Sequence, residues 1–137
     1  MDKQELIRLA LEARERAYCP YSGFSVGAAL LTREGRVFCG CNIENAGFSP
    51  TLCAERTAMA QAIAAGCRDF ALLAVVGGRA GRAAEEYFWP CGVCRQWLAE
   101  FCHPDFPVLC ALSSGEYQEA TLAGLLPHMF SPKDLSK

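Results

Sequence analysis

The sequence has little excess charge and no long apolar segment. Its 137 residues carry a formal net charge of −2, and lysine and arginine form no dense run. Because nucleic-acid binding depends on neutralising phosphates with basic side chains, these features argue against a nucleic-acid partner. The longest apolar stretch, Phe70 to Val76, is far too short to cross a bilayer, so we expect no membrane span.

Secretion signals, repeats and histidine pairs are also lacking. Met1 to Glu5 is polar, so we expect a cytoplasmic protein whose cysteines stay reduced. The nine cysteines are an odd number, which a fully paired disulfide framework cannot use. His103 and His128 do not have the spacing of metal ligands. No linker interrupts the chain, so residues 1–137 are expected to form one domain.

Helical and strand patterns alternate along the chain, which predicts an α/β fold with one sheet covered by helices. Helices are expected from Asp2 to about Tyr18, over 53–65 and 90–102, and in a short segment capped by Thr121. Strands are expected over 24–32, 36–42, 70–76, 108–112 and 117–120. A loop is expected over 77–89, with a helical turn near 83–86, and the tail from Ser131 is expected to be loose.

Three cysteines and one glutamate carry the main chemical signal. Cys91 and Cys94 form a Cys-x-x-Cys pair after Pro90, and Cys53 lies two residues before Glu55. Three thiolates can hold zinc and leave the fourth tetrahedral position open for water. A carboxylate beside that water can move protons, so Glu55 is the expected catalytic residue of a zinc hydrolase.

Both cysteine clusters are expected at helix starts, where unpaired N–H groups stabilise thiolates. Three thiolates and one zinc ion sum to a charge of −1, and Arg56, one helical turn after Cys53, is expected to offset part of it. The alternatives are a structural zinc site, which would need a fourth ligand, or a redox-active Cys-x-x-Cys. The remaining cysteines are expected to be small buried hydrophobic residues: Cys19, Cys39, Cys41, Cys67, Cys102 and Cys110.

The strings Cys53-Ala54-Glu55-Arg56-Thr57-Ala58 and Pro90-Cys91-Gly92-Val93-Cys94-Arg95-Gln96 resemble the cytidine deaminase family, in its small homotetrameric form. The likeness extends over Tyr21 to Leu30, Cys41 to Ala46 and the Leu125-Leu126-Pro127 region. It implies a three-layer α/β/α sandwich with a central five-stranded mixed sheet, one zinc ion per chain, and a homotetramer with shared active sites. The implied reaction is hydrolytic deamination of cytidine and 2′-deoxycytidine in pyrimidine salvage, with Glu55 as the proton shuttle.

The resemblance also implies a set of substrate-binding residues. Asn42 and Glu44 would bind the ribose hydroxyls, Phe24 would pack on the pyrimidine face, and backbone groups near Ala54 would read the base edge. Phe130 would reach the active site of a neighbouring subunit. From the residues alone, Asn42 and Glu44 could equally cap a loop, and Phe24 could be an ordinary core aromatic.

Two departures from the family pattern concern the substrate. Phe48 stands where relatives often have tyrosine, and the segment Arg79 to Trp89 is longer than usual. Its Tyr87-Phe88-Trp89 cluster would either pack at a subunit interface or narrow the pocket. Deamination of another aminopyrimidine, such as an antibiotic of the blasticidin type, therefore stays open as an alternative.

Overall fold

The computed structural model describes residues 1–136, and within them five strands form one mixed sheet. The order across the sheet is β2–β1–β3–β4–β5, with β3 and β4 parallel and the other neighbouring pairs antiparallel. The strands are β1 (Phe24–Thr32), β2 (Val37–Cys41), β3 (Phe70–Arg79), β4 (Pro107–Ala111) and β5 (Tyr117–Thr121). The expected five-stranded mixed sheet is confirmed.

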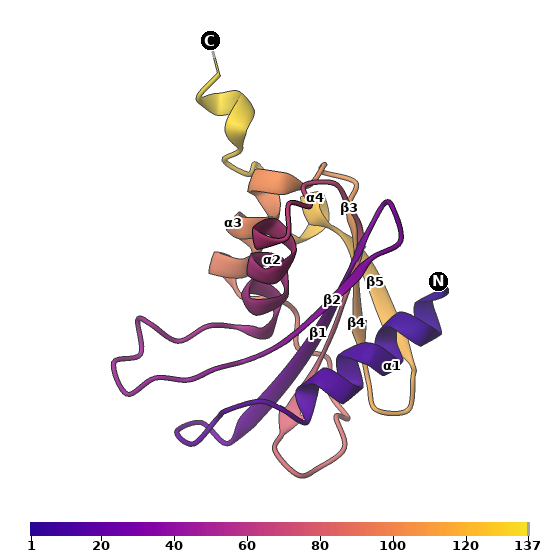
Figure 1. The fold of residues 1–137 in the computed structure, drawn as a ribbon, viewed down its shortest axis with the longest axis vertical. Helices are drawn as coiled ribbons and strands as arrows, with labels where there is room; N and C mark the ends of the chain where they lie inside the picture. The colour runs from indigo at the N-terminus through magenta and orange to yellow at the C-terminus, as the bar shows by residue number, and fades with distance from the viewer. Residues whose placement is uncertain (137) are drawn as a thin grey trace.

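Helices cover both faces of this sheet (Figure 1). Helix α1 (Lys3–Arg14) lies on one face, and α2 (Ala54–Ala64) and α3 (Gly92–Phe101) lie on the other. Because side chains alternate along a strand, Ala28 and Leu30 of β1 pack toward α2, whereas Ala29 packs toward α1. The α/β/α sandwich is therefore confirmed. Among residues 1–136, no helix is both long and apolar enough to cross a membrane.

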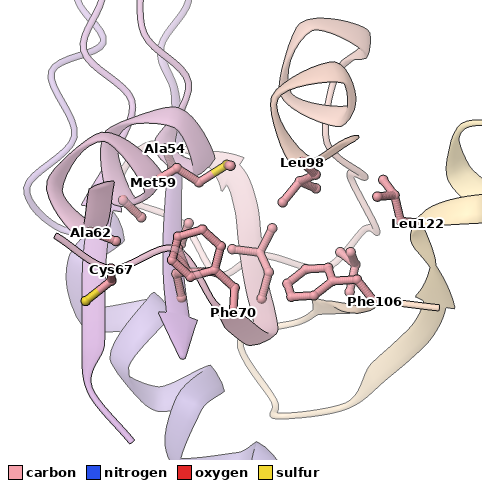
Figure 2. Close-up of a cluster of buried hydrophobic side chains, with 13 residues drawn as sticks. Ala54, Met59, Ala62, Cys67, Phe70, Leu98, Phe106 and Leu122 are labelled. Atoms are coloured by element: carbon pink, nitrogen blue, oxygen red, sulfur yellow. The ribbon is translucent and has the colours of Figure 1, made fainter. Parts of the chain in front are cut away.

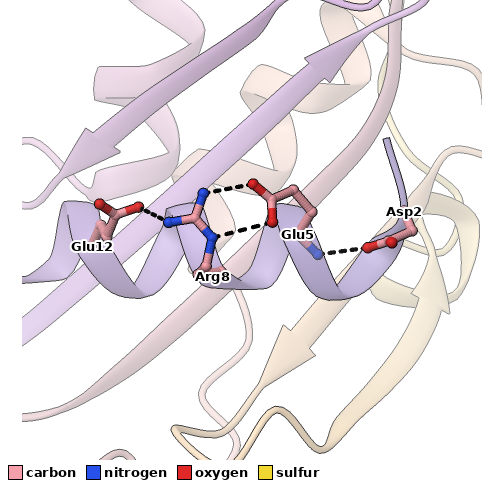
Figure 3. Close-up of polar contacts among 4 residues, drawn as sticks. All are labelled: Asp2, Glu5, Arg8 and Glu12. Atoms are coloured by element: carbon pink, nitrogen blue, oxygen red, sulfur yellow. Dashed lines mark hydrogen bonds and ion pairs between the residues drawn. The ribbon is translucent and has the colours of Figure 1, made fainter.

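Asp2, where the first helix was expected to start, caps α1 (Figure 3). The carboxylate of Asp2 accepts a hydrogen bond from the backbone N–H of Glu5 at 2.7 Å. Arg8 then donates to both Glu5 and Glu12 on the exposed side of the helix. The helix ends at Arg14, four residues before the predicted end at Tyr18. The prediction of the helix end was wrong because the chain turns there to join the sheet.

Contacts made by Arg14 and by Tyr18 explain this early end. The guanidinium of Arg14 reaches the sheet and donates to the carbonyl oxygens of Ser25 at 3.0 Å and Arg79 at 2.8 Å. Tyr18 N–H donates to the carbonyl of Asn42, so the chain after the helix pairs with the segment that follows β2. Tertiary contacts here outweigh the local helical preference of residues 15–18.

The core on the α2 and α3 face is shown in Figure 2. Met59 from α2, Leu98 from α3, and Phe70 and Phe106 from the strand side fill the layer. Leu98 and Met59 are fully buried. Burying such side chains stabilises the fold by about 1.5–3 kcal/mol each, which holds both helices against the sheet. The two helix starts that carry the cysteines are thereby fixed relative to each other.

Several segment boundaries differ from the expectation. Strand β3 continues through Gly77 and Gly78 to Arg79, because these residues pair with the start of β1. Residues 83–86 form no helical turn, and Pro90 lies outside α3, whose N-cap is Cys91. The expected loose tail instead contains the 3₁₀ turn η1 (Pro132–Asp134). The short helix α4 (Leu122–Leu125) is capped by the Thr121 hydroxyl as predicted.

The expected burial of the other six cysteines is only partly correct. All nine cysteines are free, and Cys67 and Cys110 are buried. The remaining four of these six are half-buried and lie near the surface of the single chain: Cys19, Cys39, Cys41 and Cys102.

Candidate metal centre and active site

Helices α2 and α3 both begin at a cysteine. Cys53 is the N-cap of α2 and Cys91 is the N-cap of α3, each with extended backbone. N-cap side chains usually accept a hydrogen bond from their own helix. Within residues 1–136 neither cysteine has such a cap bond, so both Sγ atoms are left for another role.

A glycine of β2 lets α2 approach the sheet closely. A Cβ at Gly40 would lie 2.5 Å from both the carbonyl oxygen of Ala54 and the amide nitrogen of Ala58. Only a residue without a side chain permits this approach. The first turn of α2 is therefore set by direct packing on the β2 backbone.

The structure brings the three predicted sulfur ligands together. The Sγ atom of Cys91 lies 3.6 Å from that of Cys53 and 3.5 Å from that of Cys94. All three atoms lie within 4.8 Å of one another. Tetrahedral zinc with Zn–S bonds of about 2.3 Å requires neighbouring sulfurs roughly 3.8 Å apart. The three thiolates therefore fit zinc.

A fourth protein ligand is missing from this group. Among the described residues, the cluster holds three sulfurs and no histidine or carboxylate. A structural zinc site is normally closed by four protein ligands, whereas a catalytic site keeps one position open. The geometry therefore favours the catalytic alternative over the structural one.

Glu55 lies in the first turn of α2, two residues after Cys53. It is only 4% exposed. Burial raises the pKa of Glu55 to about 7, and the nearby charge of Cys53 adds to this rise, while Arg56 opposes it. A carboxyl group with such a pKa can both accept and release a proton near neutral pH.

Arg56 contacts the sulfur cluster directly. Its Nη2 donates to the Sγ of Cys53 at 3.5 Å and to the carbonyl oxygen of Thr51 at 3.2 Å. Its Nε is buried and has no acceptor within the described part of the chain. Hydrogen bonds from Cys94, and then from Arg56 and Cys91, lower the pKa of Cys53 to about 5 against the effect of burial. The site thus favours a thiolate at Cys53.

Asn42 follows β2 and is 8% exposed. Its Oδ1 accepts from the N–H of Val26, and its Nδ2 donates to the carbonyl of Phe24, both at 2.8 Å. The side chain therefore replaces a backbone partner at the end of the β1–β2 pair. A carboxamide has two donors and two acceptor sites, so one donor and about one acceptor site remain.

Glu44 holds the loop before β1. Its carboxylate accepts from the N–H groups of Tyr21 and Ser22 at 3.0 and 3.1 Å, and from the Ser22 hydroxyl. The Ser22 hydroxyl, followed by these two N–H groups, lowers the pKa of Glu44. A cavity of about 400 Å³ lies beside it, lined by Tyr21, Ser22, Glu44, Asn45, Phe48 and Thr51.

Phe24 opens β1 on the same face of the sheet as Ala28, the face that α2 covers. Ala54 is fully buried at the start of α2. Phe130 lies beyond α4, is 57% exposed, and is held through its carbonyl oxygen by Gln96 at 2.8 Å. Figure 1 shows this C-terminal segment projecting away from the sheet. The structure thus groups the three cysteines and Glu55 and leaves Phe130 largely exposed on the single chain.

The structure places one aromatic residue beside Phe24 that the sequence did not single out. Phe88, from the long segment before Pro90, packs edge-on against Phe24 with ring centroids 4.7 Å apart. The sequence signal was the aromatic cluster Tyr87-Phe88-Trp89. Nothing local in that cluster tells which of its rings turns toward β1.

Comparison with known proteins places this site in a family. Residues 1–110 match the family described as "Cytidine and deoxycytidylate deaminase zinc-binding region". The cytidine deaminase of Sporosarcina psychrophila is 49% identical over 136 residues, which cover 99% of this chain and 96% of the relative. The cytidine deaminase of Halalkalibacterium halodurans is 46% identical, with 99% of both chains covered.

A solved structure agrees with these sequence matches. The crystal structure of cytidine deaminase from Burkholderia pseudomallei aligns with a TM-score of 0.86 and 45% identity, covering 95% of this chain and 100% of that one. The chain therefore belongs to the cytidine deaminase family. The family match covers a zinc-binding region, so zinc is the cofactor of this family, and the cluster of three cysteines could hold it.

Proposed function

We propose that this chain catalyses the zinc-dependent hydrolytic deamination of cytidine and 2′-deoxycytidine to uridine and 2′-deoxyuridine, with release of ammonia. The observation that carries the proposal is a three-thiolate cluster, open at one position, with the buried carboxylate of Glu55 beside it. When bound, zinc supplies the Lewis acidity that makes water a nucleophile near neutral pH.

Glu55 moves the protons in this reaction. A C–O bond forms at C4 of the pyrimidine and the C4–N bond to the amino group breaks. Glu55 takes one proton from the attacking water and delivers it to N3, and then passes the second proton to the departing amine. Ammonia leaves, and the ring retains a carbonyl at C4. The position of Glu55 in the first turn of α2 keeps its carboxylate next to the sulfur cluster without binding the metal.

Arg56 adjusts the charge of the metal centre. Three thiolates carry one negative charge more than a zinc ion neutralises. The 3.5 Å contact between Arg56 Nη2 and Cys53 Sγ offsets part of that excess. The carbonyl of Thr51 fixes the guanidinium in this position.

The substrate lies between the metal centre and the segment after β2. Phe24 packs on the base, and backbone groups near Ala54 read its edge. Asn42 and Glu44 bind the sugar hydroxyls with the hydrogen-bonding capacity that their structural bonds leave free. Glu44 accepts three hydrogen bonds within the chain, whereas a carboxylate has about four acceptor sites.

The enzyme works as a homotetramer with shared sites, in which Phe130 contacts the substrate of a neighbouring subunit. Its 57% exposure supports this role. Other large apolar side chains exposed on the single chain are available for the same assembly: Tyr18, Tyr21, Ile43 and Phe48. Nine free thiols suit the reducing cytoplasm, where the reaction serves pyrimidine salvage.

The test is ultraviolet monitoring of purified, zinc-loaded protein with a panel of aminopyrimidines. The panel contains cytidine, 2′-deoxycytidine, free cytosine and an aminopyrimidine antibiotic of the blasticidin type. We expect both nucleosides to be converted with release of one ammonia each, and cytosine to be a poor substrate because it lacks the sugar. No conversion of either nucleoside, or faster conversion of the antibiotic, would overturn the proposal.

A further inference from the structure

The rings of Phe24 and Phe88 form an edge-to-face pair. Their centroids are 4.7 Å apart and their planes are inclined by 83°. This is the geometry that the charge distribution of aromatic rings favours. Phe88 comes from the segment between β3 and α3, which is absent from the residues that the family resemblance assigns to the site.

The segment that carries Phe88 is fixed at several points. Ala80 N–H donates to the carbonyl of Gly23 at 2.9 Å, which ties the start of the segment to the residue before Phe24. Ala84 is 1% exposed and exchanges two hydrogen bonds with Ser113, at 2.7 and 2.9 Å.

The same segment is also fixed at Phe88 itself. The backbone of Phe88 lies close enough to the thiol of Cys110, a buried residue of β4, to lower the pKa of that thiol against the larger opposing effect of burial. Phe88 therefore lies over β4 as well as beside Phe24.

The other side of Phe24 is set by a glycine. A Cβ at Gly77 of β3 would lie 3.3 Å from Cε2 of Phe24, closer than side chains normally pack. The Phe24 ring is therefore confined between the β3 backbone and the ring of Phe88. This confinement leaves Phe24 little freedom to change rotamer.

The aromatic pair borders open space. Phe24 and Phe88 both line a cavity of about 610 Å³, and Phe88 is 38% exposed. An aromatic pair that served only the core would be sealed from solvent. The lining of this cavity does not include the cysteine cluster or Glu55, so the cavity shows that the aromatic pair is accessible from solvent.

We propose that Phe88 is a positioning residue for the base: it holds the ring of Phe24 in the orientation against which the pyrimidine packs. The inference rests on the proposed function, because it takes Phe24 as the residue that contacts the base. Phe88 acts through Phe24, so the two side chains must behave as one unit in binding.

The experiment compares steady-state kinetics on cytidine for wild type, Phe88→Ala, Phe24→Ala and the double variant, with zinc content measured in each. We expect Phe88→Ala to raise KM about threefold to tenfold, in line with the strength of an aromatic pair, and to change kcat less than twofold. The double variant should match Phe24→Ala alone, since Phe88 has nothing to position once that ring is gone.

Two further variants separate positioning from stability. Tyr87→Ala removes a half-buried neighbouring ring from the same segment, and its KM should stay at the wild-type value. Phe88→Leu keeps apolar bulk without a ring, so it should raise KM even where Phe88→Ala folds poorly. A purely structural role for Phe88 would lower the melting temperature and leave the KM of Phe88→Leu unchanged, which would overturn the inference.

The outcomes also separate this inference from the proposed function. Absence of cytidine turnover in wild type would remove the proposed function, and the inference with it. A second outcome would overturn the inference and leave the proposed function standing. In it, wild type converts cytidine and Phe24→Ala raises KM, but Phe88→Leu keeps the wild-type KM. KM increases that multiply in the double variant would also overturn it, because they would mean that the two rings act independently.

Discussion

The cysteine cluster and the proposed sugar-binding end of the site use their side chains differently. At the cysteine cluster, Cys53 and Cys91 begin helices without capping them in the described chain, and their Sγ atoms contact neighbouring cysteines and Arg56. At the proposed sugar-binding end, Asn42 and Glu44 already hold the backbone of β1 and of the loop before it.

This difference means that activity and stability are separable at one end and joined at the other. Neither α2 nor α3 depends on the side chain of its N-cap cysteine for a capping hydrogen bond, so replacing these cysteines should mainly cost metal binding and turnover. The fold does depend on Asn42 and Glu44, so replacing them should cost substrate binding and stability together. Each of the following changes tests one side of this contrast.

Cys91→Ala should have the largest effect. Losing one of three ligands should abolish stoichiometric zinc binding and reduce turnover of cytidine below detection. In the presence of chelator, its free energy of unfolding should stay within about 0.5 kcal/mol of metal-free wild type, because the Cys91 side chain is exposed and caps nothing. Metal analysis, the ultraviolet assay and urea unfolding test this. If the free energy of unfolding of the metal-free variant fell by several kcal/mol, the Cys91 side chain would also stabilise the fold, which contradicts this account.

Glu55→Gln should have the next largest effect. The substitution keeps the shape of the side chain and removes its ability to shuttle protons, so kcat should fall about a hundredfold to ten-thousandfold. Zinc content should remain one per chain, since Glu55 is not among the ligands. Turnover near the wild-type rate would show that another group carries the protons.

Asn42→Ala should damage binding and stability at once. It leaves the N–H of Val26 and the carbonyl of Phe24 without partners near a buried position, at a cost of about 1–3 kcal/mol. The exposed Asn45, which accepts one local bond from Gly47, provides the matched control: Asn45→Ala should cost less than about 1 kcal/mol. Urea unfolding of the metal-free variants measures both, and equal losses would contradict the assigned role.

Phe130→Ala should raise KM for cytidine about threefold to tenfold and leave zinc content unchanged, because the ring would contact substrate rather than metal. Leu135→Ala is the control, since Leu135 is a still more exposed apolar residue of the same tail, at 74%. Steady-state kinetics decide the matter. A wild-type KM in the Phe130 variant would remove this residue from the site.

Glu44→Gln should give the smallest effect, seen as a change in pH dependence. The folded pKa of Glu44 is lowered from 4.5 by the Ser22 hydroxyl and two backbone N–H groups. Its contribution to stability is therefore complete above pH 4.5 and is lost as pH falls through the folded pKa. Wild type should be more stable than the variant at pH 7, and the difference should shrink below pH 4.5. A constant difference across this range would contradict the linkage.

Local patterns in the sequence were sufficient to predict most elements and the three cysteines that the fold brings together. Strand β1 was predicted with its observed bounds, and the cysteines were correctly expected at helix starts, because turn residues and spacing act over short distances. The end of α1 and the extension of β3 were missed, since both depend on pairing with residues far along the chain. The glycines at positions 77 and 78 favour a loop when the sequence is considered locally. In the fold they pair with β1 and continue the strand.

The structural bonds of Asn42 and Glu44 were also beyond local patterns. Their partners lie 16 to 23 residues away in the sequence, and only the folded sheet brings them together. The contact between Phe88 and Phe24 joins two segments in the same way. Spacing identifies a group of metal ligands, whereas the positions of substrate-facing side chains depend on the tertiary fold.

A zinc titration tests most directly whether the thiolates of Cys53, Cys91 and Cys94 hold the catalytic metal. Metal-free wild type, Cys91→Ala and Glu55→Gln receive increasing zinc, and bound zinc and cytidine turnover are measured in the same samples. We predict that wild-type turnover rises linearly and stops rising at one zinc per chain, that Glu55→Gln binds one zinc with little turnover, and that Cys91→Ala does neither. Full turnover without zinc, or undiminished zinc-dependent turnover in Cys91→Ala, would contradict the account.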